Sequence, residues 1–297
     1  MENNEQFDLS KYVAEDIEKY SGISMPVKAG FFHRLLIKKL QCKKLHMNPD
    51  DEFSHPDVGP NLKVISEYTQ KFLNNYKANG NYYYHQEPLF VEKLYPDGYR
   101  ILNGHHRWAA AFKLKIKNII VNVVNMTHES EIKEIIRNSK HDKRVTMDLD
   151  EVVFFDPNTM TGDQAEKPLG FPYKRFYKEK LRLGIPALFR CLEKNGYDIW
   201  VYSSKYYSSD YVKSLFHKYH VNITGIVAGM EKRKDKKNKY DNILKEKYKH
   251  TLHIDNDLVL KIDTQTGDFK EYNIDSSGGW SKNIIEIIGN IAKDEKE

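Results

Sequence analysis

The chain is poor in cysteine and has no long apolar run. Its two cysteines, Cys42 and Cys191, are far apart in the 297-residue sequence, which excludes a disulfide framework and a CxxC metal pair. No apolar run approaches the roughly 18 residues that a membrane-spanning helix needs. The N-terminal stretch MENNEQFDLSKY is too polar and acidic for a signal peptide. We therefore expect a cytoplasmic protein that does not enter a membrane.

A strong excess of charge of one sign is also missing. The sequence has 47 basic and 42 acidic residues, which gives a formal net charge of +5. So small a surplus permits a phosphate-bearing partner, including nucleic acid, without requiring one. Hydrophobic residues make up 40% of the chain, enough to fill two cores, and the length favours two domains.

The first half is predicted to be a small α+β domain over residues 30–128, preceded by a polar N-terminal extension over residues 1–29. A polar helix over residues 129–142 is expected to connect it to the second half. Hydrophobic spacing and turn residues predict the elements of this domain: helices at 31–40, 62–80 and 105–115, and strands at 88–94, 99–103 and 118–124.

The second half, residues 143–297, alternates strands with helices. This alternation predicts a parallel sheet with helices on both faces, and ligands should bind beyond the carboxyl ends of its strands. The expected strands are 145–149, 198–204, 223–229 and 251–255, and the expected helices are 185–196, 208–219, 240–248 and 280–292.

Polar side chains follow three of these strands. Charged groups beside a buried strand cost several kcal/mol unless something binds them. Such a site suits the transfer of a phosphoryl group. The phosphoryl group and a carboxylate nucleophile are both negative, and a bound metal ion together with a lysine would offset their repulsion. Mg²⁺ prefers oxygen ligands, and two or three carboxylates from the protein are enough to bind it. The residues in question are Asp148 and Asp150, Ser203 and Ser204, and Asp255 and Asp257, with a lysine-rich run at 231–240.

Simpler explanations exist for each of these features taken alone. An Asp after a strand is often a turn residue or a helix cap. Ser203 and Ser204 could cap the following helix, and the lysine-rich run could be a solvated surface. The order of all four features along the chain favours a shared site.

The same four features resemble the motifs of the haloacid-dehalogenase-like (HAD) phosphohydrolases, over roughly residues 143–290. The stretch DLDEV is similar to the DxDx(T/V) signature, with Val152 in the last place. VYSS resembles the second motif, the lysine-rich run the third, and HIDND the fourth. Many members have adjacent acids where this chain has Asp255 followed by Asn256.

The resemblance implies a role for each matching residue. Asp148 would be the nucleophile that forms an aspartyl-phosphate, and Asp150 the general acid and base. Ser203 would bind the phosphate, and Lys239, or next Lys236, would neutralise it. The Mg²⁺ ligands implied are Asp148, Asp150 through its backbone carbonyl, Asp255 and Asp257. The segment between Asp150 and Ser203 is too short for a full helical cap, so we expect a minimal cap and an open crevice.

The stretch NGHHRWAAA marks a second candidate site in the first half. A helix that begins after Asn103-Gly104 presents backbone N–H groups, and His105, His106 and Arg107 add donors for an anion. The alternative is a glycine turn into a helix whose first polar residues are merely exposed.

Residues 40–125 resemble the ParB/sulfiredoxin fold, which implies that Gly104, His105, His106 and Arg107 bind the phosphates of a nucleotide such as ATP or CTP. His105 replaces the catalytic cysteine of sulfiredoxin. The free-serine kinase branch has Asp-Gly-His-His-Arg, whereas this chain has Asn103, and its catalytic Glu would align loosely with Glu52.

The expected protein is a magnesium-dependent phosphatase of phosphomonoesters with an N-terminal nucleotide- or phosphate-binding domain. Two alternatives remain open at this point: a nucleotide-binding regulatory protein, and a bifunctional kinase and phosphatase of a small molecule.

Overall fold

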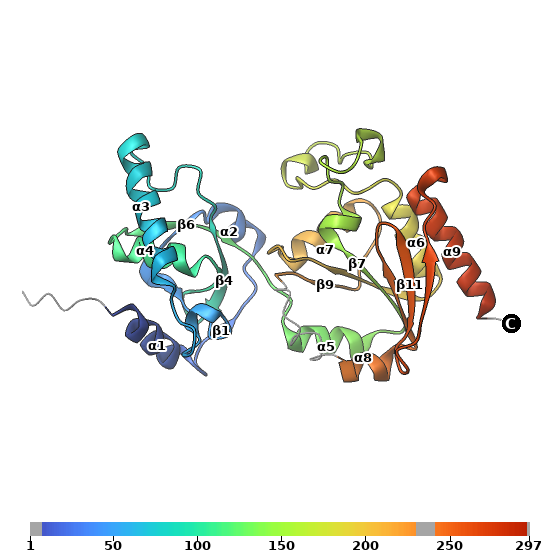
Figure 1. The fold of residues 1–297 in the computed structure, drawn as a ribbon, viewed down its shortest axis with the longest axis horizontal. Coiled ribbons are helices and arrows are strands. Elements are labelled where there is room, and N and C mark those ends of the chain that lie inside the picture. The colour runs from blue at the N-terminus through green and yellow to red at the C-terminus, as the bar shows by residue number, and fades with distance from the viewer. Residues whose placement is uncertain (1–7, 230–240, 296–297) are drawn as a thin grey trace, which may run out of the picture. The chain divides into compact units, whose positions relative to one another are not determined.

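The computed structural model describes residues 8–229 and 241–295, and the chain divides into two compact units, Met1–Asn125 and Met126–Glu297. Each unit is a mixed α/β fold built around its own mixed sheet (Figure 1). Each sheet has six strands in the described residues, and each unit has its own hydrophobic core. No helix in the described ranges is long and apolar enough to cross a bilayer.

The sheet of the first unit has the order β2-β6-β4-β5-β3, and β1 pairs with β4. Two pairs, β4 with β6 and β3 with β5, are parallel, whereas the others are antiparallel. The sheet is therefore mixed, as an α+β domain allows. Its strands are β1 (Met25–Pro26), β2 (Lys39–Gln41), β3 (Leu45–His46), β4 (Leu89–Tyr95), β5 (Tyr99–Asn103) and β6 (Asn118–Val123).

The described part of this unit, from residue 8 onward, contains four α-helices. The α3 helix begins at an Asn61 cap, whose side chain accepts from two backbone N–H groups, and it ends at Gly80 with φ 64°. The α4 helix buries Trp108 and Ala109 to Ala111 in the core of the unit. The helices are α1 (Leu9–Tyr20), α2 (Phe31–Leu36), α3 (Leu62–Asn79) and α4 (His105–Lys113).

The segment predicted as a polar extension contains the α1 helix. Asp8 caps it, and its buried Asp16 accepts from the Met47 backbone N–H and lies 3.1 Å from His46 Nδ1. The helix looks polar in sequence because its exposed face is charged and one of its two buried residues is an acid. The helix predicted to run to residue 40 ends at Leu36, because Lys39–Gln41 pairs with β6 instead.

The sheet of the second unit has the order β12-β11-β10-β7-β8-β9. The strands β10, β7, β8 and β9 are parallel, as expected, but β11 and β12 add an antiparallel hairpin that the sequence did not predict. The strands are β7 (Lys143–Asp148), β8 (Tyr197–Tyr202), β9 (Gly225–Val227), β10 (His250–Ile254), β11 (Leu258–Asp263) and β12 (Phe269–Asn273).

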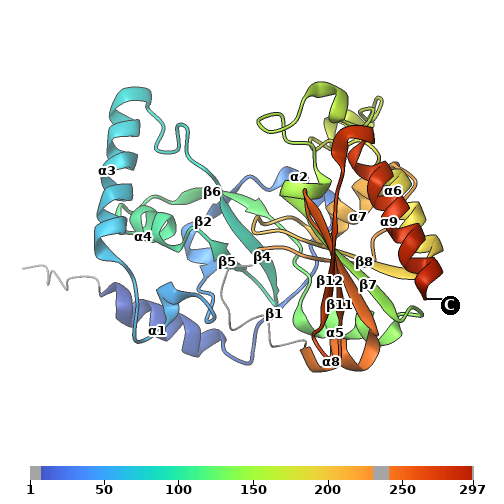
Figure 2. The same ribbon diagram turned by 45° about the vertical axis from the view of Figure 1, so that its right-hand side comes forward.

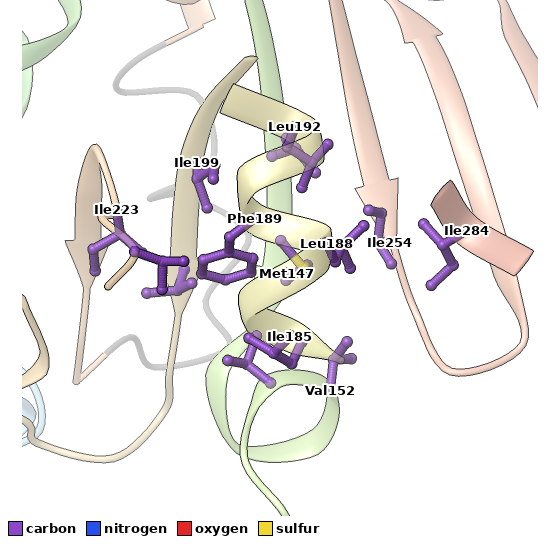
Figure 3. Packing of buried hydrophobic residues seen from close by; sticks show 14 of the residues in the cluster. Met147, Val152, Ile185, Leu188, Phe189, Leu192, Ile199, Ile223, Ile254 and Ile284 are labelled. Carbon is purple, nitrogen blue, oxygen red and sulfur yellow. The ribbon is translucent and has the colours of Figure 1, made fainter. Parts of the chain in front are cut away.

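Helices cover both faces of this sheet. Because side chains alternate along β8, Ile199 packs with α6, α7 and α9, whereas Trp200 packs with α5 and α8. Figure 3 shows α6 lying against the first face, with Phe189 and Leu188 directed at Met147. The helices are α5 (Glu129–Asn138), α6 (Ile185–Lys194), α7 (Ser209–Lys218), α8 (Asp241–Lys247) and α9 (Trp280–Asp294).

The helix expected as a connector, α5, is part of the second unit. Its Ile132 and Ile136 are buried against Trp200 and Tyr248. Burial of side chains of this size contributes about 1.5–3 kcal/mol each, so α5 is held by packing rather than acting as a free linker.

A long irregular segment leads from β7 to α6. It begins with a π turn, Leu149–Val153, and contains two 3₁₀ turns, Gly162–Gln164 and Tyr173–Arg175. Single bridges join Phe154 to Leu181 and Ala165 to Arg182. The segment lies beyond the end of β7 in both views of the ribbon (Figures 1 and 2).

Candidate functional site at the strand ends of the second unit

The register of the parallel strands brings three predicted side chains to one edge of the sheet. Met147 pairs with Ile254, so Asp148 and Asp255 are the next residues on neighbouring strands. Asp148 in turn pairs with Tyr202, the residue before Ser203. Since neighbouring strands lie about 4.8 Å apart, Asp148 has Asp255 on one side and Ser203 on the other.

Asp148 holds the π turn that follows β7. Its Oδ1 accepts hydrogen bonds of 2.8 Å from the backbone N–H groups of both Asp150 and Glu151. Leu149 and Val152, on the same turn, are buried in the core and fix it to the sheet. Within the described part of the chain, the other carboxylate oxygen of Asp148 accepts no hydrogen bond, which leaves it available to a ligand.

Asp150 accepts three hydrogen bonds from residues that follow β8. The buried Ser203 hydroxyl donates over 2.5 Å to Oδ2, and Lys205 Nζ and the Tyr207 hydroxyl each donate over 2.8 Å to Oδ1. The hydrogen bond that Lys205 donates to Asp150 raises the pKa of Lys205. Burial, with a smaller effect of Asp150, raises the pKa of Tyr207. At neutral pH Lys205 is therefore charged and Tyr207 is a proton donor.

Asn256 connects the turn after β10 to the π turn. Its side chain accepts a 2.7 Å bond from Arg182 Nη1 and donates over 3.4 Å to the Glu151 carbonyl. Trp280 Nε1 donates to the Asn256 carbonyl over 3.0 Å, and the Arg182 guanidinium lies 3.9 Å from the Trp280 ring centroid. These contacts fix the backbone from which Asp255 and Asp257 project.

The predicted metal ligands do not form a ready-made cluster. Nowhere in residues 8–229 and 241–295 do three or more His, Cys, Asp or Glu side chains converge as a metal site. Mg²⁺ does not need three, because it is usually bound by one or two carboxylates, waters and substrate phosphates. Asp148 and Asp255, on neighbouring strand ends, supply two.

The other two predicted ligands are placed differently. The Asp150 carboxylate is occupied by its three donors, so only its backbone carbonyl is available to an ion, as the sequence resemblance implies. Asp257 lies near Arg182: burial lowers the pKa of that guanidinium, and the charge of Asp257 opposes the shift. The predicted phosphate-neutralising lysine, Lys239, and its alternative Lys236 lie outside the described residues.

Four residues of this site were not predicted: Lys205, Tyr207, Asn256 and Arg182. Lys205 and Tyr207 follow Ser203 within four positions, so their closeness in sequence was the available signal. Arg182 is 74 residues from Asn256, and no sequence pattern connects the two.

The second candidate site lies at the start of α4 in the first unit. Gly104 has φ 100°, and a Cβ there would lie 2.9 Å from Leu89 Cγ, so glycine is needed. Arg107 donates from Nη1 to the Glu87 carbonyl over 2.6 Å and from Nη2 to Asn103 Oδ1 over 2.9 Å. The Arg107 side chain therefore joins the residues before β4 to the last residue of β5.

The two histidines of this site are also held inside the unit. His105 is buried, and its Nδ1 lies 3.4 Å from Asp51 Oδ1. Burial lowers the pKa of His105 to about 4, so the imidazole is neutral at pH 7 and this contact is not an ion pair there. His106 Nε2 accepts from the Asn61 backbone over 3.2 Å. The acid beside His105 is thus Asp51 rather than the neighbouring Glu52.

Comparison with known families identifies one part of the chain. Residues 83–151 match the family model of the ParB N-terminal domain. The match confirms the predicted ParB-like part over β4, β5, α4 and β6, and it continues through α5 and β7 to the π turn. It covers fewer than a quarter of the 297 residues. No curated protein matches the chain. The resemblance of the second half to HAD phosphohydrolases stays a prediction.

Proposed function

We propose that the second unit is a magnesium-dependent phosphohydrolase of the HAD type that removes phosphate from a phosphomonoester. One observation carries the proposal: the strand register places Asp148 between Asp255 and Ser203, and Ser203 binds Asp150. The sequence resemblance assigns the nucleophile to Asp148, a metal ligand to Asp255 and the general acid to Asp150. It assigns Ser203 to binding the substrate phosphate.

The reaction proceeds in two displacements. The free carboxylate oxygen of Asp148 attacks phosphorus, the bond from phosphorus to the ester oxygen breaks, and that oxygen takes a proton from Asp150. Asp150 then removes a proton from water, which attacks the aspartyl-phosphate. Inorganic phosphate leaves, Asp148 is again a carboxylate, and Asp150 keeps the proton from water and is again the acid with which the cycle began.

The donors around Asp150 give it both roles. In the free site Ser203, Lys205 and Tyr207 donate to its two oxygens, an arrangement that suits the carboxylate acting as a base in the second displacement. A bound phosphate presents stronger acceptors, so Ser203 and Lys205 would turn from Asp150 to the phosphate oxygens. With these two donors gone, Asp150 takes up one proton from solvent as the substrate binds, and it gives this proton to the leaving oxygen. Tyr207 keeps the carboxyl group oriented.

Asp148, Asp255 and the backbone carbonyl of Asp150 would hold Mg²⁺. When bound, the ion neutralises charge on the phosphate and lowers its repulsion of the Asp148 carboxylate. The donor chemistry fits this ion, since all three groups are hard oxygen ligands.

Hydrolysis of an aryl phosphate by the full chain tests the proposal. We expect release that depends on Mg²⁺, stops on chelation, and falls by at least about a hundredfold in Asp148→Asn, because a nucleophile is lost. The matched control is Asp268→Asn, an exposed acid in the turn between β11 and β12. Equal rates in Asp148→Asn and the parent would contradict the mechanism.

A second candidate function, nucleotide binding by the first unit, is favoured by the ParB N-terminal match. Because the His105, His106 and Arg107 side chains are bound internally, the backbone N–H groups in the first turn of α4 would contact phosphate. Titration with ATP and CTP, followed by calorimetry, tests it. No heat of binding at millimolar nucleotide would contradict it.

A further inference from the structure

The irregular segment between the π turn and α6 carries an unusual concentration of cations and rings. We refer to residues 167–182 as the basic-aromatic segment. It has a single acidic residue, Glu179, among six basic and four aromatic ones. The basic residues are Lys167, Lys174, Arg175, Lys178, Lys180 and Arg182, and the aromatic residues are Phe171, Tyr173, Phe176 and Tyr177.

The rings of this segment are exposed where a core would bury them. Phe171 is 71% exposed, and Tyr173 and Phe176 are each 41% exposed. Cations lie over two of them, Arg175 at 5.3 Å from the Phe171 centroid and Lys218 at 4.4 Å from the Tyr173 centroid. Exposed rings flanked by cations are surfaces on which a flat, anionic ligand can stack.

Most of the cations are not neutralised by the protein. Within the two ranges that the structure describes, no carboxylate forms a salt bridge with Lys174, Arg175, Lys178 or Lys180. Glu179 accepts from the Tyr211 hydroxyl, so it is directed to α7. The segment therefore presents a net positive surface to solvent.

The base of the segment is fixed to the candidate active site. The Phe155 backbone N–H donates to the Lys180 carbonyl, and the Arg182 N–H donates to the Val153 carbonyl, each over 2.9 Å. Val153 is the last residue of the π turn that contains Asp150, and Phe155 lies two residues further along the chain. Arg182 also binds Asn256, next to Asp255. Figures 1 and 2 both show the segment extending from the end of the sheet at which this turn lies.

We propose that the basic-aromatic segment binds single-stranded nucleic acid and delivers its terminal phosphate to Asp148. The substrate class would then be the phosphorylated end of a single strand. This inference rests on the proposed phosphatase function for its chemistry, but the binding of the strand itself does not.

The chemistry of the segment favours this ligand over other anions. A single strand offers backbone phosphates to lysines and arginines and unstacked bases to aromatic rings, and each stacked base contributes measurably to affinity. An acidic peptide or an inorganic phosphate would use the cations and leave the rings in water. A duplex keeps its bases stacked on one another, so it would not use the rings either.

Binding is measured on full-length protein that carries Asp148→Asn, so that the terminal phosphate is not removed. The probe is a fluorescent oligonucleotide of about ten nucleotides with a terminal phosphate, a length within the usual site size. Anisotropy is recorded between about 50 and 200 mM salt, because affinity for a single strand falls with salt by a slope of about 0.7 per phosphate contact.

Two variants test the two halves of the surface. Replacing Lys174 and Arg175 by Gln should lower the salt slope by about 1.4, since two phosphate contacts are lost. Phe171→Ala should weaken binding on the order of tenfold at every salt concentration, since one stacking ring is lost. The matched control replaces Lys194 and Lys293 by Gln; both are exposed in the last turns of α6 and α9, and this variant should bind like the parent.

The outcomes separate this inference from the proposed function. Parent-like affinity and slope in both segment variants would overturn the segment as a binding surface, even if aryl phosphate hydrolysis still depends on Asp148. Binding of polyglutamate or of an anionic vesicle as tight as that of the oligonucleotide would also overturn it. Weaker oligonucleotide binding in the two segment variants, with parent-like binding in the control variant, would support the segment as a binding surface. That conclusion would hold whatever the aryl phosphate assay shows.

Discussion

The Ser203 hydroxyl donates a 2.5 Å hydrogen bond to the Asp150 carboxylate, although 53 residues separate the two along the chain. Parallel pairing of β7 with β8 is the cause, because it brings the ends of both strands to the same edge. The bond joins a turn after one strand to a loop after the next. It therefore fixes the position of the proposed general acid, Asp150, relative to Ser203, the residue proposed to bind the phosphate.

Removal of the Ser203 hydroxyl should impair catalysis more than folding. Ser203→Ala leaves Asp150 with Lys205 and Tyr207 as donors, and it removes one donor from the phosphate. We expect kcat for aryl phosphate to fall by roughly ten- to a hundredfold, and the free energy of unfolding by about 1 kcal/mol. Steady-state kinetics and urea unfolding measure the two effects.

The neighbouring serine provides the control for this substitution. Ser204 is exposed, whereas Ser203 is buried. Ser204→Ala should leave both kcat and stability close to the parent, because a solvated hydroxyl is removed. If the two alanine variants lost activity equally, the bond from Ser203 to Asp150 would have no special part in the reaction.

Lys205 should contribute to phosphate binding without contributing to stability. Its side chain is 66% exposed and pairs with Asp150, so its loss should change the free energy of unfolding by less than about 1 kcal/mol. Lys205→Met should nevertheless lower kcat/KM by at least about tenfold, because a charge beside the phosphate is lost. Lys205→Arg, which keeps the positive charge, should retain part of the kcat/KM that Lys205→Met loses.

Lys245, an exposed lysine in the last turn of α8, is the control for Lys205. Lys245→Met makes the same change in net charge at a position that has no hydrogen bond or salt bridge to Asp148, Asp150 or Ser203 in the described residues. A parent-like kcat/KM in Lys205→Met would show that another cation binds the phosphate. Equal losses in both methionine variants would instead point to the net charge of the protein.

The convergence of Asp148, Ser203 and Asp255 could be predicted from the sequence, because carboxyl ends of parallel strands meet at one edge. The strands themselves were predictable from their apolar runs. The hairpin of β11 and β12 was not, since Phe269 is 66% exposed and its strand has no buried residue to mark a face. Burial, which makes a strand recognisable, is missing there.

Side-chain partners were much harder to predict than positions. The sequence shows that Arg107 is a cation, but the carbonyls of Glu87 and Pro88 reach it only through the fold. Likewise, Tyr207 reaches Asp150 because of the path that the loop takes after β8. Such contacts depend on loop geometry, for which sequence spacing gives no rule.

Gly104 should be required for the stability of the first unit. Its φ of 100° is in the region that favours glycine, and an added Cβ would lie 2.9 Å from Leu89 Cγ and 3.0 Å from Arg107 Nη2. Gly104→Ala should lower the free energy of unfolding by roughly 1–3 kcal/mol. Urea unfolding followed by circular dichroism measures the change.

Gly30 offers a matched control for that substitution. It precedes α2 with φ −62°, and an added Cβ would meet nothing within 4 Å. Gly30→Ala should therefore be neutral or slightly stabilising, because it only restricts the unfolded chain. A Gly104→Ala variant as stable as Gly30→Ala would show that the start of α4 adapts to a side chain.

His105 should make the first unit sensitive to acid. Burial lowers its pKa in the folded state to about 4, below the ordinary value of 6.5. The unfolded chain therefore binds a proton at His105 as the pH falls below 6.5, whereas the folded chain does so only near pH 4. The contribution of the neutral His105 to the free energy of unfolding is fully present above pH 6.5. It is lost as the pH falls from 6.5 towards 4, and the free energy of unfolding decreases by up to about 1.4 kcal/mol per pH unit.

Urea unfolding at several pH values between 7.5 and 4.5 measures this dependence. In His105→Asn the stability should fall less steeply with decreasing pH than in the parent, by at most one proton's slope. His55→Asn, which replaces an exposed histidine of the same unit, is the matched control. If both variants kept the slope of the parent, the buried imidazole would already be protonated in the folded state, and the 3.4 Å contact with Asp51 would be an ion pair after all.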